Sequence, residues 1–343
     1  MRVSLTPLAQ ACLNVFVENQ STLNGVSSDF ISQGNMFNVV PKVEYRWLQG
    51  VQNASDFLKR ITMDTCDEMI VNDLGYESSG LISGRTNTDN EDRKTKSLGS
   101  VKGVKYECVD IDHDTHITFK DLNRWSEYDK ARFLDRINER REASKANDIV
   151  MIGWHGTKAA ADTNVTENPL GQDVAIGWVQ HVKTNKKENF LEDAITIGKD
   201  GDYKNLDAFV IAAKAQIPPH KRKDLVCLAS PELVDIRNVG LAEIADVGET
   251  ADQKVRLSQA YLSDGTEVLS PDFFPEKMVI ITPLKNLHHL TKKGSTRITP
   301  ETNSKRSRYE LYQQSVETYA IGDYEQIIIF SNVASADAGT EGA

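Results

Sequence analysis

The 343-residue chain carries 50 acidic and 40 basic side chains, a net charge of −10, and 39% hydrophobic residues, which is an ordinary soluble composition. The acidic balance argues against a protein that grips nucleic acid through a basic surface, and no apolar run approaches the roughly 20 residues that cross a bilayer. The length exceeds the size at which one core usually stops growing, so two or more lobes are expected.

The first 37 residues form a separate segment. Six residues recur at helical spacing: Leu5, Leu8, Ala9, Cys12, Val15 and Phe16. A polar stretch over 19–35 follows, and its composition predicts a linker of low order. Two interpretations remain open, a frayed terminal helix with its linker or a detachable peptide that binds a partner. A secretion signal is excluded, because Asn14 and Glu18 interrupt the short apolar run.

Two extended regions come next. Residues 38–68 are predicted to form an extended arm with a short helix over 51–60. Residues 69–118 are predicted to form a long two-stranded excursion with a polar tip, because apolar residues are sparse between Asn72 and Lys105. Such a hairpin is marginal by itself in water, and loops of this length are usually functional or disordered. It is therefore either disordered or a flap that becomes ordered on a neighbouring copy.

A long helix is predicted over residues 121–155. The chain has neither Pro nor Gly from Leu122 to Ile152, and an apolar stripe recurs at spacings of three, four and five. Asp121 is the expected N-cap, and Gly153 and Gly156 are the expected stops. At 1.5 Å per residue the helix would span roughly 50 Å.

The apolar stripe of this helix is expected to pack against the body through Trp125, Phe133 and Ile137. A coiled-coil arm is the alternative, but the stripe thins after Ile137 and no heptad persists. The pattern favours a strut that lies across one side of a sheet.

The second half of the chain mixes short strands and helices without a regular βαβ period, which favours an α+β architecture. Asn168 and Pro169 are predicted to open a helix. Strands are predicted at 195–197, 225–228, 279–281 and 327–330, with a helix from Leu206 to Ala213. Residues 288–315 are polar and basic and predict a second projecting loop. The last residues, 334–343, are predicted to be a disordered tail.

No catalytic, cofactor-binding or metal-binding residues can be assigned. The most site-like cluster is Asp110, Asp112, Asp114 and His116, which would share one face of a strand. It could hold a cation, but Thr115 stands where a calcium loop needs its Gly, so a solvated strand face is preferred. His288 and His289 have no acidic or Cys partner at ligand spacing and are expected to be surface residues.

A family resemblance runs from Phe37 to Val333. The stretches that carry it are Ser55–Ile61, Tyr106–Cys108, Asn168–Trp178, Gly198–Tyr203 and Phe273–Pro275. They resemble the major capsid proteins of P2-like tailed phages, which have the HK97-type fold. The resemblance is weakest over 1–36 and 230–270.

The resemblance implies a lobe for each region of the chain. The implied regions are a segment removed on maturation (1–37), an N-arm (38–68), an E-loop (69–118), a P-domain with the spine helix (119–215), an A-domain (216–287), a P-loop and P-domain return (288–315), a final strand region (316–333) and the tail (334–343). Removal of the segment is expected to cut the chain at Phe37 and Asn38.

The implied function is a non-enzymatic shell subunit of the virion capsid, assembled in the host cytoplasm. Its implied partners are other copies of itself, in hexamers and pentamers, and a scaffolding protein that carries a protease. A portal protein and head-completion or decoration proteins are further implied partners. The shell would enclose double-stranded DNA without sequence-specific binding, and no membrane is involved. A metal-dependent hydrolase and a monomeric binding module are the competing function classes.

Overall fold

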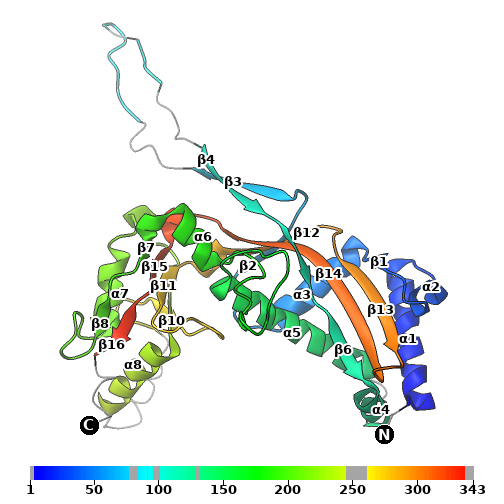
Figure 1. Cartoon of the computed structure of the whole chain (residues 1–343). Helices are drawn as coiled ribbons and strands as arrows, with labels where there is room; N and C mark the ends of the chain where they lie inside the picture. Colours follow the sequence, from blue (N-terminus) through cyan, green and yellow to red (C-terminus); the bar gives the residue numbers. More distant parts are fainter. Residues whose placement is uncertain are drawn as a thin grey trace.

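The computed structural model describes residues 4–76, 83–90, 92–95, 101–128, 132–244 and 261–336. Figure 1 shows an arched body of mixed helices and strands, from which one long hairpin projects. The predicted α+β architecture is therefore confirmed. Buried apolar residues gather in clusters, one of which joins residues of both large sheets. None of the described helices is both long and apolar enough to cross a membrane.

The larger sheet has seven strands and is built around the 14-residue strand β14. β14 pairs antiparallel with β13 and β12 along one edge and with β5 and β6 along the other, while β1 and β2 extend the sheet outward. The strands are β1 (Phe37–Asn38), β2 (Thr62–Cys66), β5 (Val109–Asp112), β6 (Thr115–Thr118), β12 (Leu287–Lys292), β13 (Arg297–Asn303) and β14 (Arg308–Ile321).

The projecting loop predicted over 288–315 is wrong, since these residues lie mostly in β12, β13 and the first half of β14. Along β12, buried and half-buried side chains alternate, and His289 and Thr291 are among the buried ones. The polar composition therefore reflects a sheet face that buries polar groups, which composition cannot distinguish from a loop.

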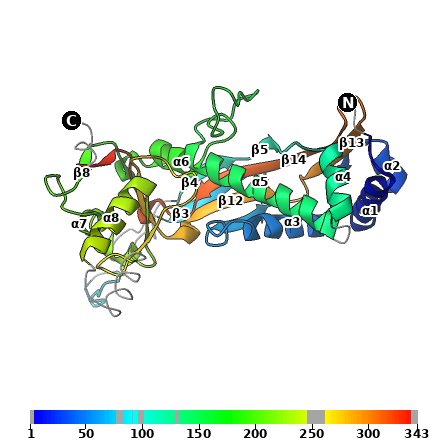
Figure 2. The same cartoon turned by 90° about the horizontal axis from the view of Figure 1, so that it is seen from below.

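Three helices cover one face of this sheet. They are α3 (Pro41–Asn53), α4 (Phe119–Tyr128) and α5 (Phe133–His155). Figure 2 shows α3 and α5 side by side beneath the strands. α6 (Trp178–Asn185) packs against the end of α5, where a Cβ on Gly153 would lie 2.2 Å from the Trp178 ring. Gly153 therefore permits a close approach between helices instead of ending α5, and Gly156 follows the last helical residue.

The single helix predicted over 121–155 is wrong, because α4 and α5 are separate helices. Residues 129–131 between them lie outside the described residues. The apolar stripe contained one spacing of five residues, which a continuous helix of 3.6 residues per turn does not keep on one face. The N-cap is Thr118, whose Oγ1 accepts a hydrogen bond from Asp121 N at 3.2 Å. The 23 residues of α5 span about 35 Å.

The N-terminal expectations over 19–68 are also corrected. α1 (Pro7–Asn24) and α2 (Ser28–Ser32) occupy the stretch predicted as a low-order linker. Polar residues cap both helices at their N-termini. The Thr6 side chain accepts a hydrogen bond from Ala9 N in α1, and the Ser27 side chain accepts one from Phe30 N in α2. The arm is not extended, because α3 begins directly at Pro41, whose fixed φ suits the first position of a helix.

The second lobe contains a five-stranded sheet in the order β10-β9-β11-β15-β7 and a two-stranded β16-β8 pair. Its strands are β7 (Phe190–Leu191), β8 (Ile195–Ile197), β9 (Val226–Ala229), β10 (Glu267–Leu269), β11 (Val279–Thr282), β15 (Ile328–Phe330) and β16 (Val333–Ser335). Its helices are α7 (Leu206–Lys214) and α8 (Pro231–Ile244). The four predicted strands and the helix from Leu206 are confirmed.

Two expectations in this lobe are wrong. Asn168 does not cap a helix, since its side chain donates to Asp173 Oδ2 at 3.0 Å within a loop, and the helix begins at Trp178. The tail predicted from residue 334 is ordered at its start, because β16 pairs parallel with β8 and includes Ala334 and Ser335. Residues 337–343 lie outside the described residues.

The excursion predicted over 69–118 is present as an antiparallel hairpin. β3 (Ile70–Tyr76) pairs with β4 (Val101–Glu107), and Figure 1 shows both strands rising away from the body. Residues 77–82, 91 and 96–100 lie outside the described residues. The chain returns to the body sheet through β5 and β6.

Candidate functional site

The N-terminal helix α1 is docked on the body. One cluster joins side chains of α1 to side chains of α4, α5 and β14, namely Ala9, Cys12, Leu13, Phe16, Phe119, Leu122, Phe133, Ile137, Tyr309 and Leu311. Hydrogen bonds fix both ends of the segment: Thr6 N donates to Asn123 Oδ1 at 2.8 Å, and Val40 N donates to Asn24 Oδ1 at 3.1 Å. The predicted apolar stripe is confirmed for Ala9, Cys12 and Phe16, whose side chains are buried, although Val15 faces solvent.

The three expected packing residues of the spine lie in or beside this cluster. Phe133 and Ile137 are each only 1% exposed. Trp125 is half-buried, and the Arg140 guanidinium lies 4.6 Å from its ring centroid. Phe133 and Ile137 therefore belong to the cluster that joins the sheet to the docked segment, a placement that the sequence did not reveal.

Phe37 and Asn38, the expected processing position, lie in strand β1. β1 pairs antiparallel with β13, and the Phe37 side chain is buried. The residues just before it form an exposed turn after α2, where Gly34 has a φ of +75° and Met36 is 58% exposed. The accessible backbone is thus the turn at 33–36, directly upstream of the expected position.

The hairpin β3–β4 is anchored at its base by Tyr106. Its hydroxyl lies 2.9 Å from both Ile321 O and Tyr324 Oη, and its ring packs 4.9 Å from the His181 ring. Burial lowers the pKa of His181 to about 4, so this imidazole is neutral at neutral pH. Beyond the base, β3 and β4 pair with each other, and the described residues 83–90 and 92–95 are exposed. The described residues at the tip of the hairpin are therefore open to solvent.

A buried charged cluster joins α5 to the sheet. The Glu317 carboxylate on β14 accepts from Ser315 Oγ at 2.6 Å and lies 2.8 Å from Lys145 Nζ and 3.1 Å from His289 Nε2. Burial alone would raise the pKa of Glu317, but the Lys145 ammonium and the His289 contact hold it below its usual range. The prediction that His289 is a surface residue is wrong: its side chain is buried, and its carboxylate partner Glu317 is remote in sequence.

The Asp110–His116 cluster is a solvated strand edge. Asp110, Asp112, Asp114 and His116 are exposed on β5 and β6 and the turn between them. No group of three or more potential metal ligands occurs among the described residues. β5 and β6 lie at an outer edge of the sheet, and charged side chains on an edge strand discourage unwanted pairing with another chain.

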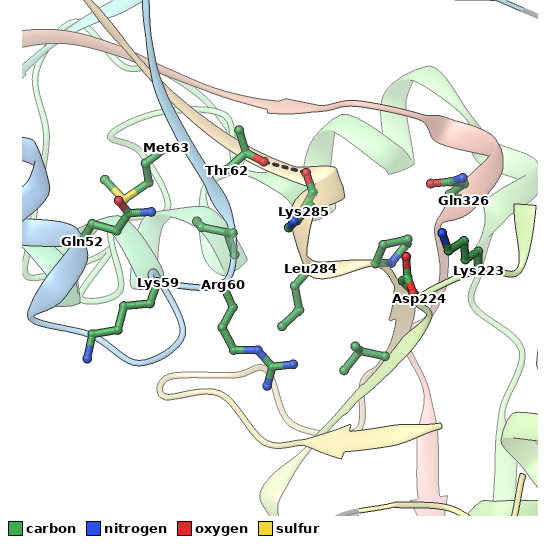
Figure 3. Close-up of a pocket in the computed structure, with 13 residues that line it drawn as sticks. Gln52, Lys59, Arg60, Thr62, Met63, Lys223, Asp224, Leu284, Lys285 and Gln326 are labelled. Carbon is green, nitrogen blue, oxygen red and sulfur yellow. Dashed lines mark hydrogen bonds between the residues drawn. The ribbon is translucent and has the colours of Figure 1, made fainter. Parts of the chain in front are cut away.

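An open pocket lies between the two lobes, and Figure 3 shows the residues that line it. Its volume is about 710 Å³. Thr62 Oγ1 donates to Lys285 O across it at 2.8 Å. Four cationic side chains contribute to its lining, but Arg60 is already paired with Glu267 through contacts of 2.5 and 2.7 Å. The lining residues are Gln52, Lys59, Arg60, Ile61, Thr62, Met63, Lys223, Asp224, Val226, Pro283, Leu284, Lys285 and Gln326. These residues include no nucleophile paired with a base.

Residues 12–333 match the family described as phage major capsid protein, P2 family. The capsid protein of Escherichia phage P2 is 29% identical over 343 residues, which cover 95% of each chain. The major capsid protein of Serratia phage KSP20 is 24% identical over 336 residues, covering 94% of this chain and 95% of the relative.

Solved capsid structures have the same fold. A chain of the satellite phage P4 procapsid, solved with a size determination protein, has a TM-score of 0.75 at 27% identity, covering 88% of this chain and 94% of that one. A capsid chain of cyanophage A-1(L) has a TM-score of 0.52 at 13% identity, covering 83% and 92%. The HK97-type fold is therefore confirmed, and the chain belongs to the P2 family of phage major capsid proteins.

Proposed function

We propose that copies of this capsid protein form the hexamers and pentamers of an icosahedral head, assembled with a scaffolding protein that carries a protease. The shell encloses double-stranded DNA and receives a portal protein, with head-completion or decoration proteins as further partners. Membership of the P2 capsid family supports this assembly. The chain itself is a structural component of the virion shell.

The observation that carries the proposal is the projecting hairpin β3–β4 with its exposed tip. An isolated two-stranded hairpin is at best marginally stable in water, and the described tip residues here are exposed. A neighbouring copy lying under the hairpin would cover it and gain contacts across a subunit boundary. Regions 69–118 and 38–68 are accordingly proposed as the E-loop and the N-arm.

The remaining regions are proposed as the P-domain and the A-domain, which together form the body of the subunit. The proposed P-domain (119–215) contains α4 and α5, and it is completed by the return at 288–315 and the final strands at 316–333. The proposed A-domain (216–287) contributes most of the second sheet. The net charge of −10 suits the inner wall of a DNA container, because DNA binding depends mainly on neutralising phosphates with cations.

Proteolytic removal of the N-terminal segment is proposed as the step that makes assembly irreversible. α1 is a folded element whose apolar face packs on the body, and Val15 on its outer side faces solvent. The exposed turn at 33–36 offers a protease an accessible chain. The position expected at Phe37 and Asn38 lies next to this turn, within β1. A scaffolding protein that binds α1 before the cut would no longer be attached to the subunit after the cut.

The hairpin is predicted to become protected only in shells. Amides of β3 and β4 should exchange quickly in the free subunit, where the pair can open locally, and slowly once a neighbour covers it. Hydrogen–deuterium exchange on free subunits and on shells measures this, with the amides of α5 as the internal control that stays protected in both. Equally strong protection of the hairpin in the free subunit would refute the proposal.

Subunits from mature particles are predicted to lack the N-terminal segment. Their intact mass should correspond to a chain that begins within the 33–38 region, while subunits from unprocessed shells retain Met1. A chain that lacks 1–37 should still fold, since most of the core is elsewhere, but should assemble poorly with scaffold. A mature particle built of subunits that begin at Met1 would contradict the prediction.

A further inference from the structure

Two cysteines meet where the hairpin joins the body. Cys66 is the last residue of β2, and Cys108 lies between β4 and β5. Their sulfur atoms are 3.8 Å apart although the residues are 42 positions apart in sequence. All four cysteines of the chain are free thiols. The pair thus brackets the whole excursion at its base.

The backbone on both sides of this contact is held in place. Cys66 O accepts from Lys293 N at 2.9 Å, and Cys108 N donates to Met69 O at 2.9 Å. Backbone hydrogen bonds to the sheet and within the hairpin therefore fix the positions of both cysteines. A disulfide needs the sulfur atoms to approach to about 2.05 Å, which from 3.8 Å is a side-chain adjustment.

We propose that Cys66 and Cys108 form a redox modification site, which a low-molecular-weight disulfide such as oxidised glutathione converts into an intramolecular disulfide. The link closes the base of the hairpin and ties the end of β2 to the start of β5. It lies within one chain, so its formation does not depend on shell assembly or on the proposed partners.

The exchange proceeds in two balanced steps. The Cys66 thiolate attacks one sulfur of oxidised glutathione, which forms a mixed disulfide and releases one glutathione thiolate. The Cys108 thiolate then attacks the Cys66 sulfur of the mixed disulfide, and the second glutathione thiolate leaves. Two protein thiols are oxidised, one molecule of oxidised glutathione is reduced to two of glutathione, and the two thiol protons pass to the released thiolates or to water.

The surroundings decide which thiol reacts first. Cys66 is partly exposed, while Cys108 is buried. Burial raises the pKa of the Cys108 thiol to about 12, and the nearby Lys292 ammonium opposes this only partly. Burial also raises the pKa of the Cys66 thiol, but only Cys66 is exposed enough for oxidised glutathione to reach, so the first attack belongs to Cys66. A cytosol rich in reduced glutathione reverses the exchange and keeps both thiols reduced. Oxidising conditions outside such a compartment favour the link.

The other two cysteines provide internal controls. Cys12 lies in the cluster under α1 and Cys227 lies in β9, so neither belongs to the hairpin base. Both are buried, and burial raises the pKa of the Cys227 thiol to about 12. They should remain reduced under conditions that oxidise the pair.

The test treats the folded full-length chain with oxidised glutathione and counts thiols after denaturation. The expected result is a loss of two thiols, a non-reducing peptide map that joins Cys66 to Cys108, and full reversal by dithiothreitol. The link should lower the unfolding equilibrium constant about 30-fold, the low end for a native-like cross-link. Stable glutathione on Cys66 without the link, or a link that forms only in denaturant, would overturn the proposal.

Two serine variants separate the steps. Cys108→Ser should trap glutathione as a mixed disulfide on Cys66, because the resolving thiol is gone. Cys66→Ser should take up no glutathione at Cys108, because that thiol is buried. If Cys108→Ser stays unmodified, Cys66 is not the entry point and the proposal fails. The wild-type peptide map does not rely on either variant folding.

Discussion

Glu317→Ala is expected to lower the unfolding free energy by about 3–5 kcal/mol, because it leaves the buried Lys145 ammonium without its carboxylate. Lys145 Nζ lies 2.8 Å from Glu317 Oε1, and both side chains are almost fully buried. The variant also removes the acceptor of Ser315 Oγ and His289 Nε2. Chemical denaturation of the free subunit measures the loss.

A double variant and an exposed pair provide the controls. Lys145→Met combined with Glu317→Leu removes both charges and should recover most of the stability. Glu192→Ala breaks the exposed Lys183–Glu192 pair and should change stability by less than about 1 kcal/mol. If Glu317→Ala costs no more than Glu192→Ala, the cluster is not a buried ion pair.

The same cluster gives the subunit a dependence on acid pH. The pKa of Glu317 is lowered in the folded state, so its contribution to stability is fully present above the unfolded value of about 4.3. It is lost as the pH falls below that value toward the folded pKa, because the unfolded state then binds the proton first. The wild-type chain should therefore lose stability below about pH 4 more steeply than the double variant.

Phe133→Ala is expected to cost about 3–5 kcal/mol, the range for a large aromatic side chain removed from a packed core. Phe133 lies between α1 and the sheet, in contact with the cluster that includes Ile137 and Leu311. Ile137→Ala should cost about 2–5 kcal/mol for the same reason. Thermal and chemical melting of the soluble subunits measure both losses.

The docked segment makes a sharper test possible. In a chain that lacks residues 1–37, Phe133 has lost part of its contacts, so Phe133→Ala should cost clearly less there than in the full chain. Ile211→Ala, at a side chain that is 49% exposed on α7, is the matched control with little effect. If Phe133→Ala melts at the same temperature as the wild-type chain, the apolar stripe does not pack as described.

Periodicity identified several elements of the second lobe, but not all of them. Alternating or continuous short apolar runs identified β8, β9, β11 and β15, and the spacing from Leu206 identified α7. These elements are short and buried, and their local pattern agrees with their tertiary environment. The capsid fold was suggested by the resemblance of short stretches, such as Ser55–Ile61 and Asn168–Trp178, to P2-like capsid proteins.

The failures share a physical cause. β12, β13 and the first half of β14 bury polar groups such as His289 and Gln313, whose partners are remote in sequence, so composition suggested a loop. Residues 19–35 are polar but largely helical. The caps at Thr6 and Ser27 and the packing of α1 on the body stabilise helices that these polar residues would form only weakly by themselves. The Cys66–Cys108 contact was likewise invisible, since only the sheet register brings those residues together.

This chain belongs to a family of shell proteins, and we propose that its hairpin β3–β4 holds neighbouring copies together. The most direct measurement is negative-stain electron microscopy of the chain co-expressed with its scaffolding protein, beside a matched variant in which residues 77–100 are replaced by a short Gly-Ser turn. The account predicts closed shells of uniform size for the wild-type chain and soluble subunits or malformed particles for the variant. Uniform closed shells from both chains, or none from the wild type, would contradict it.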